Sequence, residues 1–310
     1  MKTLYKLEEN TKETSVALGF FDGVHIGHKK IIENAVENEK EGLVSVVLTF
    51  DKRPIEYFNT DKNKDISYLI TNEDKEDIIR DLGISKLYFL DFLKIKELSA
   101  QEFVKDILVK KLNAKKVYCG FNYHFGKGGQ ATAQTLKEIC CEYGIEVVTT
   151  KPVLYLDKVV SSTRIREALV NGEVIKANQM LGREFSYNFA IKKGNQIGRT
   201  IDKPTINQPF PQKFILPKFG VYASTVQIED KIYSSVTNIG VKPTINQHTT
   251  PLSETWIPKV KLKEMYGEKI KVQLLEFIRA ERKFDNIEQL EMQIAKDCEK
   301  SFEIFAKMMF

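Results

Sequence analysis

The sequence predicts two domains of different class. The first is an α/β domain with a Rossmann-like parallel sheet, and the second is an all-β, Greek-key barrel-like domain that ends in a helix. In the first half of the 310 residues, short apolar strands alternate with amphipathic helical segments. In the second half, β-branched runs are separated at close spacing by Gly, Pro and Asn. This change places a domain boundary at Gly182, giving domains of residues 1–182 and 183–310.

The first half divides into strands and helices by its apolar spacing. The expected elements are a strand ending at Gly19, a helix to about Glu39, a strand over 43–50, a helix over 71–83, a strand over 86–90, a helix over 99–112 and a strand over 116–120. Ligands bind such sheets at the carboxyl ends of the strands. The glycine turns at 19–27 and 120–129 are therefore expected to face one cleft.

The second half reads as an antiparallel structure closed by a helix. Strands are expected over 221–226, 233–238 and 269–277, and an amphipathic helix over about 287–305. The chain length is sufficient for each domain to bury its own core.

Composition excludes several classes of protein. The net charge is +5, with 47 basic and 42 acidic residues spread along the chain, which indicates no nucleic-acid partner. The N-terminus lacks the apolar stretch of a signal peptide, and no segment approaches 18 apolar residues, so no membrane contact is expected. The four cysteines show no CxxC spacing. We expect a cytoplasmic protein; its oligomeric state is not predicted.

The segment ALGFFDGVHIGHKKI, residues 17–31, combines the end of a strand, a glycine turn and the start of a helix. Unpaired N–H groups and the helix dipole make such a turn an anion site. His25 and His28, at i and i+3, are expected on one face of the first helical turn, where both imidazoles can donate to a triphosphate. Two alternatives are polar residues that merely begin a helix and a metal site, although no third ligand stands nearby.

This segment resembles the HxGH signature of the nucleotidylyltransferase superfamily, and FDGVHIGH in particular resembles the bacterial FAD synthetases fused to a riboflavin kinase. Three further segments are similar to motifs of that family. Residues 49–54 resemble TFDPxP, with Lys52 in place of the first proline, residues 120–129 resemble GxNFxFGxxxxG, and residues 161–166 match SSTxIR.

The resemblance implies that the first domain transfers AMP from ATP to FMN, giving FAD and pyrophosphate, with Mg²⁺ on the phosphates. It implies His25, His28 and Arg166 as catalytic residues. The implied ATP and phosphate ligands are Gly19, Phe20, Asp22, Gly23, Gly27, Ser162, Thr163 and Arg164, and the implied flavin ligands are Asn122, Phe125 and Pro54. Asn122 has two alternative contacts, the flavin-side phosphate or the adenine ribose.

The SSTRIR segment also has a physical logic of its own. Ser162 or Thr163 can cap a helix N-terminus, and Arg164 or Arg166 then projects from the first turn. A guanidinium binds phosphate in a bidentate manner, which suits a pyrophosphate leaving group.

The second half resembles the riboflavin kinase module. Segments in the family's order are 194–199, 220–222, 238–244, 266–267 and 282–284. The resemblance implies Glu254 as the catalytic base, with Thr205 and Asn207 holding nucleotide phosphates and Mg²⁺, Thr205 being the metal ligand.

Three positions depart from the kinase pattern GRxxGFPTAN, namely Asp202, Lys203 and Ile206. Asp202 adds a negative charge beside a phosphate, and Ile206 adds bulk near the nucleotide. Kinase activity is therefore in doubt. The alternatives are a monofunctional FAD synthetase whose second domain binds flavin or stabilises the fold, and a non-enzymatic flavin-binding regulator. An aminoacyl-tRNA synthetase also carries HxGH, but this chain has no KMSKS-like segment.

Overall fold

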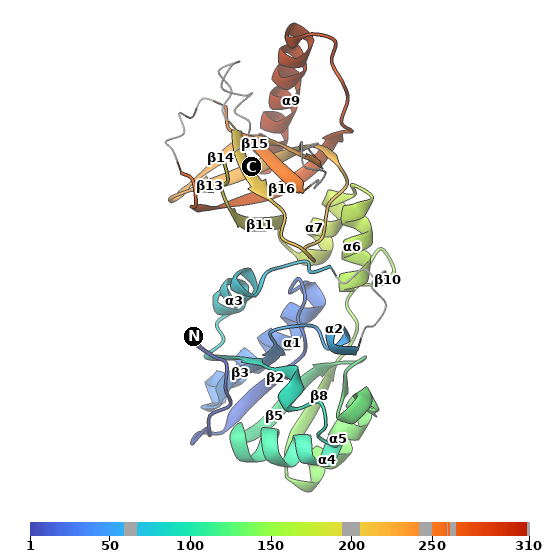
Figure 1. The fold of residues 1–310 in the computed structure, drawn as a ribbon. Helices are drawn as coiled ribbons and strands as arrows, with labels where there is room; N and C mark the ends of the chain where they lie inside the picture. The colour runs from blue at the N-terminus through green and yellow to red at the C-terminus, as the bar shows by residue number, and fades with distance from the viewer. Residues whose placement is uncertain (59–66, 194–204, 242–249, 259, 261–264, 309–310) are drawn as a thin grey trace. The chain divides into compact units, whose positions relative to one another are not determined.

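The computed structural model describes residues 1–58, 67–193, 205–241, 250–258, 260 and 265–308 (Figure 1). The chain forms two compact units. The N-terminal unit comprises residues 1–66 and 71–161, and the C-terminal unit comprises residues 67–70 and 162–310. The predicted segments 194–199, 242–244 and positions 202 and 203 lie outside the described residues.

The N-terminal unit contains a six-stranded sheet in the order β1-β4-β3-β2-β5-β8, and all its neighbouring strands are parallel. The strands are β1 (Lys2–Leu4), β2 (Thr14–Leu18), β3 (Val44–Phe50), β4 (Lys86–Leu90), β5 (Ala114–Gly120) and β8 (Glu146–Thr150). The order reverses direction between β2 and β5, where an open α/β sheet has its binding crevice.

Helices cover both faces of this sheet. They are α1 (Ile26–Glu37), α2 (Ile55–Phe58), α3 (Asn72–Asp81), α4 (Ala100–Glu102), a π-helical continuation η3 (Phe103–Lys111) and α5 (Ala133–Glu142), with 3₁₀ turns η1 (Asn38–Glu41), η2 (Phe92–Lys94) and η4 (Lys127–Gly129). Two short hairpins complete the unit, β6 (His124–Phe125) with β7 (Ala131–Thr132), and β9 (Leu154–Tyr155) with β10 (Lys158–Val159).

The N-terminal unit has two hydrophobic cores, one on each face of the sheet, and successive side chains of β2 enter them alternately. Val16 and Leu18 pack with α5 and η3, whereas Ala17 packs with α1 and α3. Because successive strand residues point to opposite faces, a strand buried on both faces must be apolar throughout. This explains why the expected strands over 43–50 and 86–90 are continuous apolar runs.

The C-terminal unit contains a six-stranded antiparallel sheet in the order β11-β16-β13-β14-β15-β12. Its strands are β11 (Phe185–Ala190), β12 (Thr205–Pro209), β13 (Gly220–Ile228), β14 (Lys231–Val241), β15 (Pro251–Trp256) and β16 (Lys269–Arg279). The sheet curls so that its outer strands meet: the fully buried Gln208 amide on β12 donates to Phe189 O on β11 and to Ile270 O on β16, both at 2.7 Å.

A chain of buried hydroxyl groups crosses the interior of this barrel. Neighbouring hydroxyls in it are 2.6 to 3.4 Å apart, in the order Tyr187, Ser253, Thr255, Thr237, Ser224 and Ser235. All six side chains are buried. Each hydroxyl can both donate and accept, so the chain satisfies its own hydrogen bonds without water.

Two helices that precede the barrel in sequence belong to the C-terminal unit. They are α6 (Ser162–Val170) and α7 (Val174–Leu181), which pack together, and α7 contacts β11 and β16. Asn178 joins them to the barrel, donating to Leu274 O at 2.9 Å and accepting from Phe185 N at 2.7 Å. The structural units thus divide after Ser161, whereas the sequence pattern changes near Gly182.

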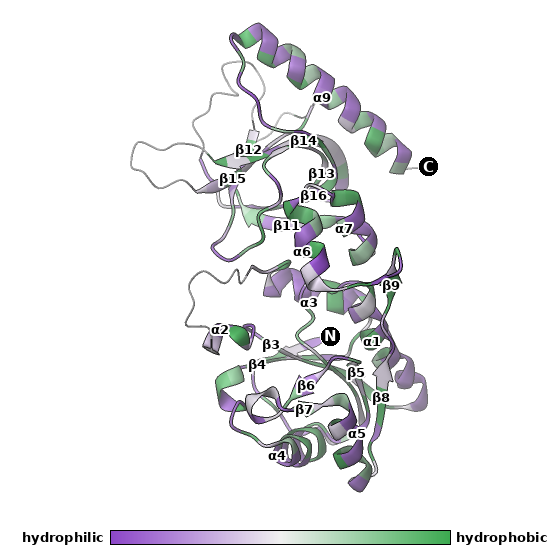
Figure 2. Ribbon diagram, turned by 90° about the vertical axis from the view of Figure 1, so that its right-hand side faces the viewer, coloured by the Kyte–Doolittle hydropathy of each residue, from purple (hydrophilic) through white to green (hydrophobic). Residues whose placement is uncertain are grey.

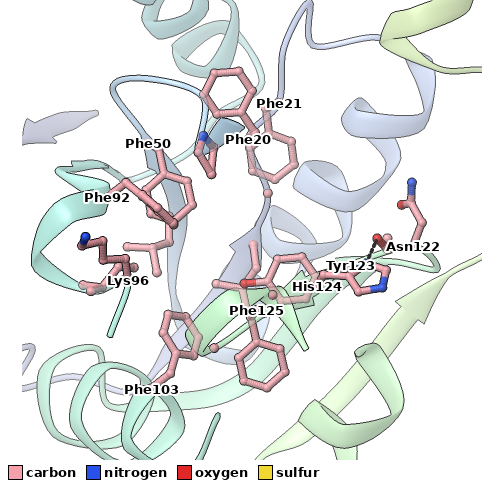
Figure 3. Close-up of a pocket in the computed structure, with 18 of the residues that line it drawn as sticks. Phe20, Phe21, Phe50, Phe92, Lys96, Phe103, Asn122, Tyr123, His124 and Phe125 are labelled. Carbon is pink, nitrogen blue, oxygen red and sulfur yellow. Dashed lines mark hydrogen bonds between the residues drawn. The ribbon is translucent and has the colours of Figure 1, made fainter. Parts of the chain in front are cut away.

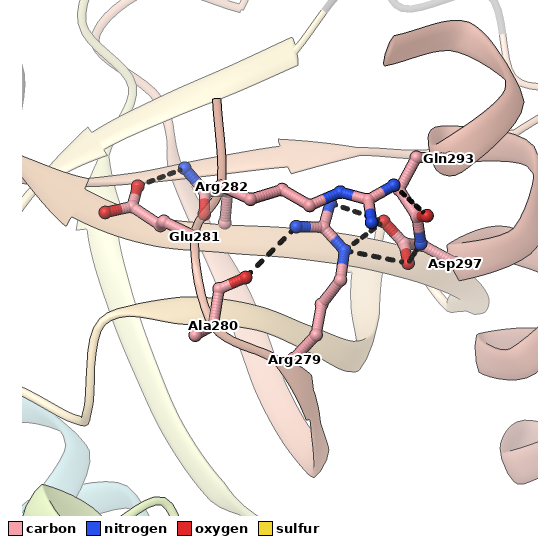
Figure 4. A network of polar contacts seen from close by, with 7 residues as sticks. Arg279, Ala280, Glu281, Arg282, Gln293 and Asp297 are labelled. Carbon is pink, nitrogen blue, oxygen red and sulfur yellow. Dashed lines mark hydrogen bonds and ion pairs between the residues drawn. The ribbon is translucent and has the colours of Figure 1, made fainter. Parts of the chain in front are cut away.

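The C-terminal helix α9 (Ile287–Met308) carries hydrophilic and hydrophobic residues along its whole length (Figure 2). Arg279, at the end of β16, holds it through an ion pair with the buried Asp297 at 2.8 Å, and Gln293 donates to the same carboxylate (Figure 4). Ser301 Oγ donates to Ser235 O at 2.6 Å. Among the described residues, no helix has the length and apolar character needed to cross a membrane.

Candidate active sites

The turn between β2 and α1 has a strained backbone. Phe21, Gly23 and Val24 have φ angles of 55°, 79° and 38°. Positive φ is natural for glycine at position 23, but it costs roughly 1–3 kcal/mol for a residue with a side chain held there. Phe21 and Val24 are nevertheless fully buried. The surrounding structure therefore forces this turn into one shape.

His25 is the N-cap of α1, one residue earlier than the first helical turn in which the sequence placed it. Its Nδ1 accepts a hydrogen bond from His28 N at 3.2 Å. A nitrogen that accepts carries no proton, so the His25 ring is neutral and its proton is on Nε2.

The rings of the two histidines are stacked. Their ring centroids are 3.5 Å apart with an interplanar angle of 16°, and the Phe21 ring contacts the His28 ring edge-on at 5.4 Å. Gly27 makes room for this arrangement, because a Cβ there would lie 3.3 Å from the His25 ring. The HIGH segment thus fixes both imidazoles in a single packed group.

A cavity of about 480 Å³ opens where β2 and β5 end, which confirms that the two glycine turns face one cleft (Figure 3). Of the predicted site residues, its lining includes Gly19, Phe20, His28, Pro54, Asn122 and Phe125. Aromatic side chains form much of the remaining wall, namely Phe21, Phe50, Phe92, Phe103 and Tyr123. Asp22, Gly23 and His25 belong to the turn and Gly27 belongs to α1, and none of the four is in the lining.

The cavity joins a polar edge to an apolar interior. Asn122 lies over Gly120, where a Cβ would come within 3.2 Å of Asn122 Oδ1. Phe125 is buried and packs against Phe103 and Tyr123, at centroid distances of 5.4 and 5.8 Å. A pocket of this size with aromatic walls and few polar groups suits a planar ring system.

The boundary between the units falls inside the SSTRIR segment: Ser161 ends the N-terminal unit, and residues 162–166 belong to the C-terminal unit. Helix α6 begins at Ser162, so the residue before the helix is Ser161, and the expected cap at Ser162 or Thr163 is wrong by one or two positions. Arg164 lies in the first turn. Arg166 Nε donates to Ser67 O at 2.8 Å, which uses one of the five guanidinium N–H groups.

In the C-terminal unit, strand register gathers the predicted kinase residues. Glu254 on β15 pairs with Asn207 on β12 and with Asn238 on β14. Directly paired residues share a face, with Cβ atoms about 4.5–5.5 Å apart. Asn207, Glu254 and Asn238 therefore form a polar row across three strands.

Thr205 and Asn207 offer oxygen atoms of the kind that Mg²⁺ prefers. Asn207 Nδ2 donates to Thr205 O at 3.1 Å and to Thr205 Oγ1 at 3.3 Å, which orients the amide. Asn207 Oδ1 is buried and accepts no hydrogen bond from the described residues. A buried oxygen in this condition beside a threonine hydroxyl fits a hard divalent cation.

Ile206 does not crowd this site. It pairs with the buried Thr255, so its side chain points to the interior face, opposite to Thr205 and Asn207, and it is 2% exposed. The expectation that its bulk lies near the nucleotide is wrong, because alternation along β12 directs it into the barrel core.

Comparisons with known proteins agree with this geometry. The family model described as FAD synthetase matches residues 7–164, and the model described as riboflavin kinase matches residues 181–305. The chain is 34% identical to the bifunctional riboflavin kinase/FMN adenylyltransferase of Bacillus subtilis, covering 97% of this chain and 96% of the relative. It is 34% identical to the protein of the same name from Listeria monocytogenes, covering 99% of both.

The chain belongs to the bifunctional riboflavin kinase/FMN adenylyltransferase family. A solved structure described as a macrolide-efflux protein from Streptococcus pneumoniae is also similar, with a TM-score of 0.86 and 31% identity over 97% of this chain and 99% of that one. The fold class predicted from the sequence, an α/β unit followed by a barrel-like β unit with a terminal helix, is confirmed.

Two polar residues next to the predicted site residues were not singled out from the sequence. Lys75 on α3 is 1% exposed, and its Nζ donates to Phe20 O at 3.0 Å. Its signal was its position four residues before Ile79, on the buried face of an amphipathic helix. Asn238 stands within a family motif, but only the pairing of β14 with β15 places it beside Glu254.

Proposed function

We propose that this chain catalyses two reactions on flavins. The C-terminal unit transfers the γ-phosphate of ATP to riboflavin to give FMN, and the N-terminal unit transfers AMP from ATP to FMN to give FAD and pyrophosphate. The relatives at 34% identity carry both activities in their names and align over nearly the whole chain. The substrates are thus the small molecules ATP, riboflavin and FMN.

The observation that carries the adenylyl transfer is the cavity between β2 and β5. Its aromatic interior, with Phe50, Phe103 and Phe125, suits the isoalloxazine ring of FMN, and its edge carries His28. A flavin seated there directs its ribityl phosphate toward the strained turn. This brings the nucleophile to the anion site at the start of α1.

The transfer needs no protein nucleophile. An FMN phosphate oxygen attacks the α-phosphorus of ATP, and the bond to the bridging oxygen breaks, releasing pyrophosphate. We assign His25 Nε2–H and His28 to hydrogen bonds with the triphosphate, together with the N–H groups that begin α1. Ser162, Thr163, Arg164 and Arg166 stay phosphate ligands predicted from the sequence motif alone. Positioning and preorganised donors then supply the rate enhancement.

In the kinase reaction Glu254 is proposed to take the proton of the ribityl hydroxyl as that oxygen attacks the γ-phosphorus of ATP. Thr205 Oγ1 and Asn207 Oδ1 would hold Mg²⁺, which neutralises charge on the phosphate oxygens when bound. Asn207, paired in register with Glu254, aligns the phosphates with the base.

Kinase activity is favoured over a silent kinase fold. Ile206 points away from the polar row, Thr205 and Asn207 keep their places, and the curated relatives are named for both activities. Asp202 and Lys203, on which the doubt also rested, lie outside the described residues.

The test is chromatographic separation of flavins after incubating the pure protein with Mg-ATP and either riboflavin or FMN. We expect FAD from FMN, and both FMN and FAD from riboflavin. If FMN yields no FAD, the adenylyl transfer is refuted. If FMN is consumed while riboflavin is unchanged, the protein is a monofunctional FAD synthetase.

A further inference from the structure

Lys75 is a buried lysine for which the chemistry proposed above has no use. It lies in the first turn of α3, which Thr71 caps by accepting from Asp74 N at 3.0 Å. The side chain is 1% exposed. Enclosing an ammonium group is costly unless it is matched by hydrogen bonds and opposite charge. The contacts of this amine therefore indicate the role of the buried lysine.

The contacts of Lys75 are made with Phe20, at the start of the turn between β2 and α1. Lys75 Nζ donates to Phe20 O at 3.0 Å and lies 4.1 Å from the centroid of the Phe20 ring. Thr49 Oγ1, at the end of β3, donates to the same carbonyl at 2.9 Å. Phe20 O thus accepts hydrogen bonds from two elements, α3 and β3. Phe20 also lines the cavity.

The Phe20 carbonyl lies immediately before the strained part of the turn. Phe21 and Val24 follow it with left-handed backbone, and His25 follows Val24 directly. A strained segment keeps its shape only where neighbouring groups over-determine it. Lys75 and Thr49 supply that constraint at the entry to the turn, while His25 supplies it at the exit by capping α1.

Two carboxylates, those of Asp22 and Asp51, interact with the charge of Lys75. Burial lowers the pKa of Lys75 to about 8, and the carboxylates of Asp22 and Asp51 oppose that shift. Asp22 is itself buried in the turn. An uncompensated carboxylate there would repel a triphosphate, so the ammonium group also offsets an unfavourable charge next to the site.

We infer that Lys75 is a positioning residue for adenylyl transfer, which fixes the Phe20 carbonyl so that the strained turn presents His28 to the cavity in its reactive geometry. This inference rests on the proposed adenylyl transfer. Lys75 is not among the residues that line the cavity, because its amine is enclosed by the turn and by Phe89, whose ring centroid is 5.7 Å away.

The experiment compares Lys75→Met and Thr49→Val with the wild type. Each removes one donor to Phe20 O while nearly keeping side-chain size. Lys110→Met, at an exposed lysine on η3 that pairs with Asp106, is the matched control. Formation of FAD from FMN reports the N-terminal unit, and formation of FMN from riboflavin in the same samples reports whether the rest of the chain is intact.

We expect Lys75→Met to lower kcat for FAD formation by about 10²-fold, the size of effect that follows a small misplacement of a reacting group. KM for FMN should change less than kcat, since the aromatic walls remain. Thr49→Val should lower kcat by a smaller factor, and Lys110→Met should leave it unchanged. The riboflavin kinase rate should be unaffected in all three.

Equal kcat in Lys75→Met and wild type would overturn the inference. So would a parallel loss of both activities, which would mean general destabilisation. Should Lys75→Met fail to fold, Thr49→Val tests the same carbonyl, and an unchanged kcat in that variant refutes the inference. A wild type that forms no FAD refutes the proposed function instead, so the two failures are distinct.

Discussion

The two units build their proposed phosphate sites in opposite ways. In the N-terminal unit, the site is a loop at the carboxyl ends of parallel strands, where a strained backbone and a helix start place two stacked histidines. In the C-terminal unit, the polar row of Asn207, Glu254 and Asn238 stands on regular strands and is placed by register alone. The first arrangement depends on the contacts that fix the conformation of a loop. The second depends on the register of neighbouring strands.

This difference has a consequence for mutation. Residues far from the ligand matter in the loop site, because the turn must be forced into shape. In the strand site, the sheet already supplies the geometry, so effects should concentrate in the row itself. Since one protein carries both sites, each activity serves as the control for the other.

The largest expected effect is on the strand site. Glu254→Gln keeps size and hydrogen bonding but removes the proposed base. We expect the rate of FMN formation from riboflavin to fall by about 10³-fold, within the usual contribution of a general base. FAD formation from FMN should be unchanged. Steady-state rates of both reactions measure this, and a fall in both would contradict the separation of the two sites.

In the loop site we expect His28→Ala to lower FAD formation by about 10²- to 10³-fold, the typical loss of one preorganised donor. His25→Asn sharpens the result. Asparagine also caps helices well, so this variant should keep α1 in place while losing the Nε2–H donor. Catalytic loss with unchanged thermal stability supports the donor role, whereas loss of stability alone would reduce His25 to a cap.

Lys75 gives a pH-dependent prediction for the loop site. Its pKa is lowered from 10.5 to about 8 in the folded protein, mainly by burial, with Asp22 and Asp51 opposing. Between these values the unfolded chain binds more protons than the native protein, so stability rises with pH. The rise should reach about 3 kcal/mol by pH 10.5 and be absent below pH 8.

Hydrogen exchange of β2 peptides, compared between wild type and Lys75→Met at each pH, isolates this contribution. The variant should lack the rise. Equal pH dependence in both proteins would show that the amine is not enclosed as the structure places it.

The smallest effect is expected at Asn238. Its Nδ2 donates to Glu281 Oε1 at 3.1 Å, which fixes the amide beside Glu254. Asn238→Ala should lower the kinase rate by about tenfold, the size of one or two hydrogen bonds, while FAD formation stays constant. A matching variant, Glu281→Gln, should have a weaker effect, because a neutral acceptor can still hold the Asn238 amide. Loss equal to that of Glu254→Gln would make Asn238 more than an aligning residue.

The same comparison explains what was predictable from the sequence. Apolar periodicity predicted β4 and α3 because their burial follows local spacing, and the resemblance identified the HIGH turn because its residues are contiguous. The neutral state of His25 was not predictable, since it depends on a hydrogen bond from His28 N. Lys75 and Asn238 were missed because their partners lie 55 residues away in sequence or on a neighbouring strand.

Two further details depend on tertiary structure in the same way. From the sequence, the bulk of Ile206 was an argument against kinase activity. In the structure, alternation along β12 directs this side chain into the barrel interior. The change of pattern near Gly182 placed residues 162–182 in the first domain, whereas Asn178 on α7 forms hydrogen bonds with the barrel. Local sequence gives the type of an element, whereas tertiary contacts decide which unit it joins.

The buried chain of hydroxyl groups favours one strand register, the register that forms the polar row of Asn207, Glu254 and Asn238. A shift of β15 by one residue would turn Glu254 into the interior and expose Ser253 and Thr255, because a single step reverses every side chain on a strand. The same shift would break the hydroxyl contacts to Tyr187 and Thr237 and leave buried polar groups without partners. A barrel with this shift should therefore be less stable than the native one, which favours the register that pairs Glu254 with Asn207 and Asn238.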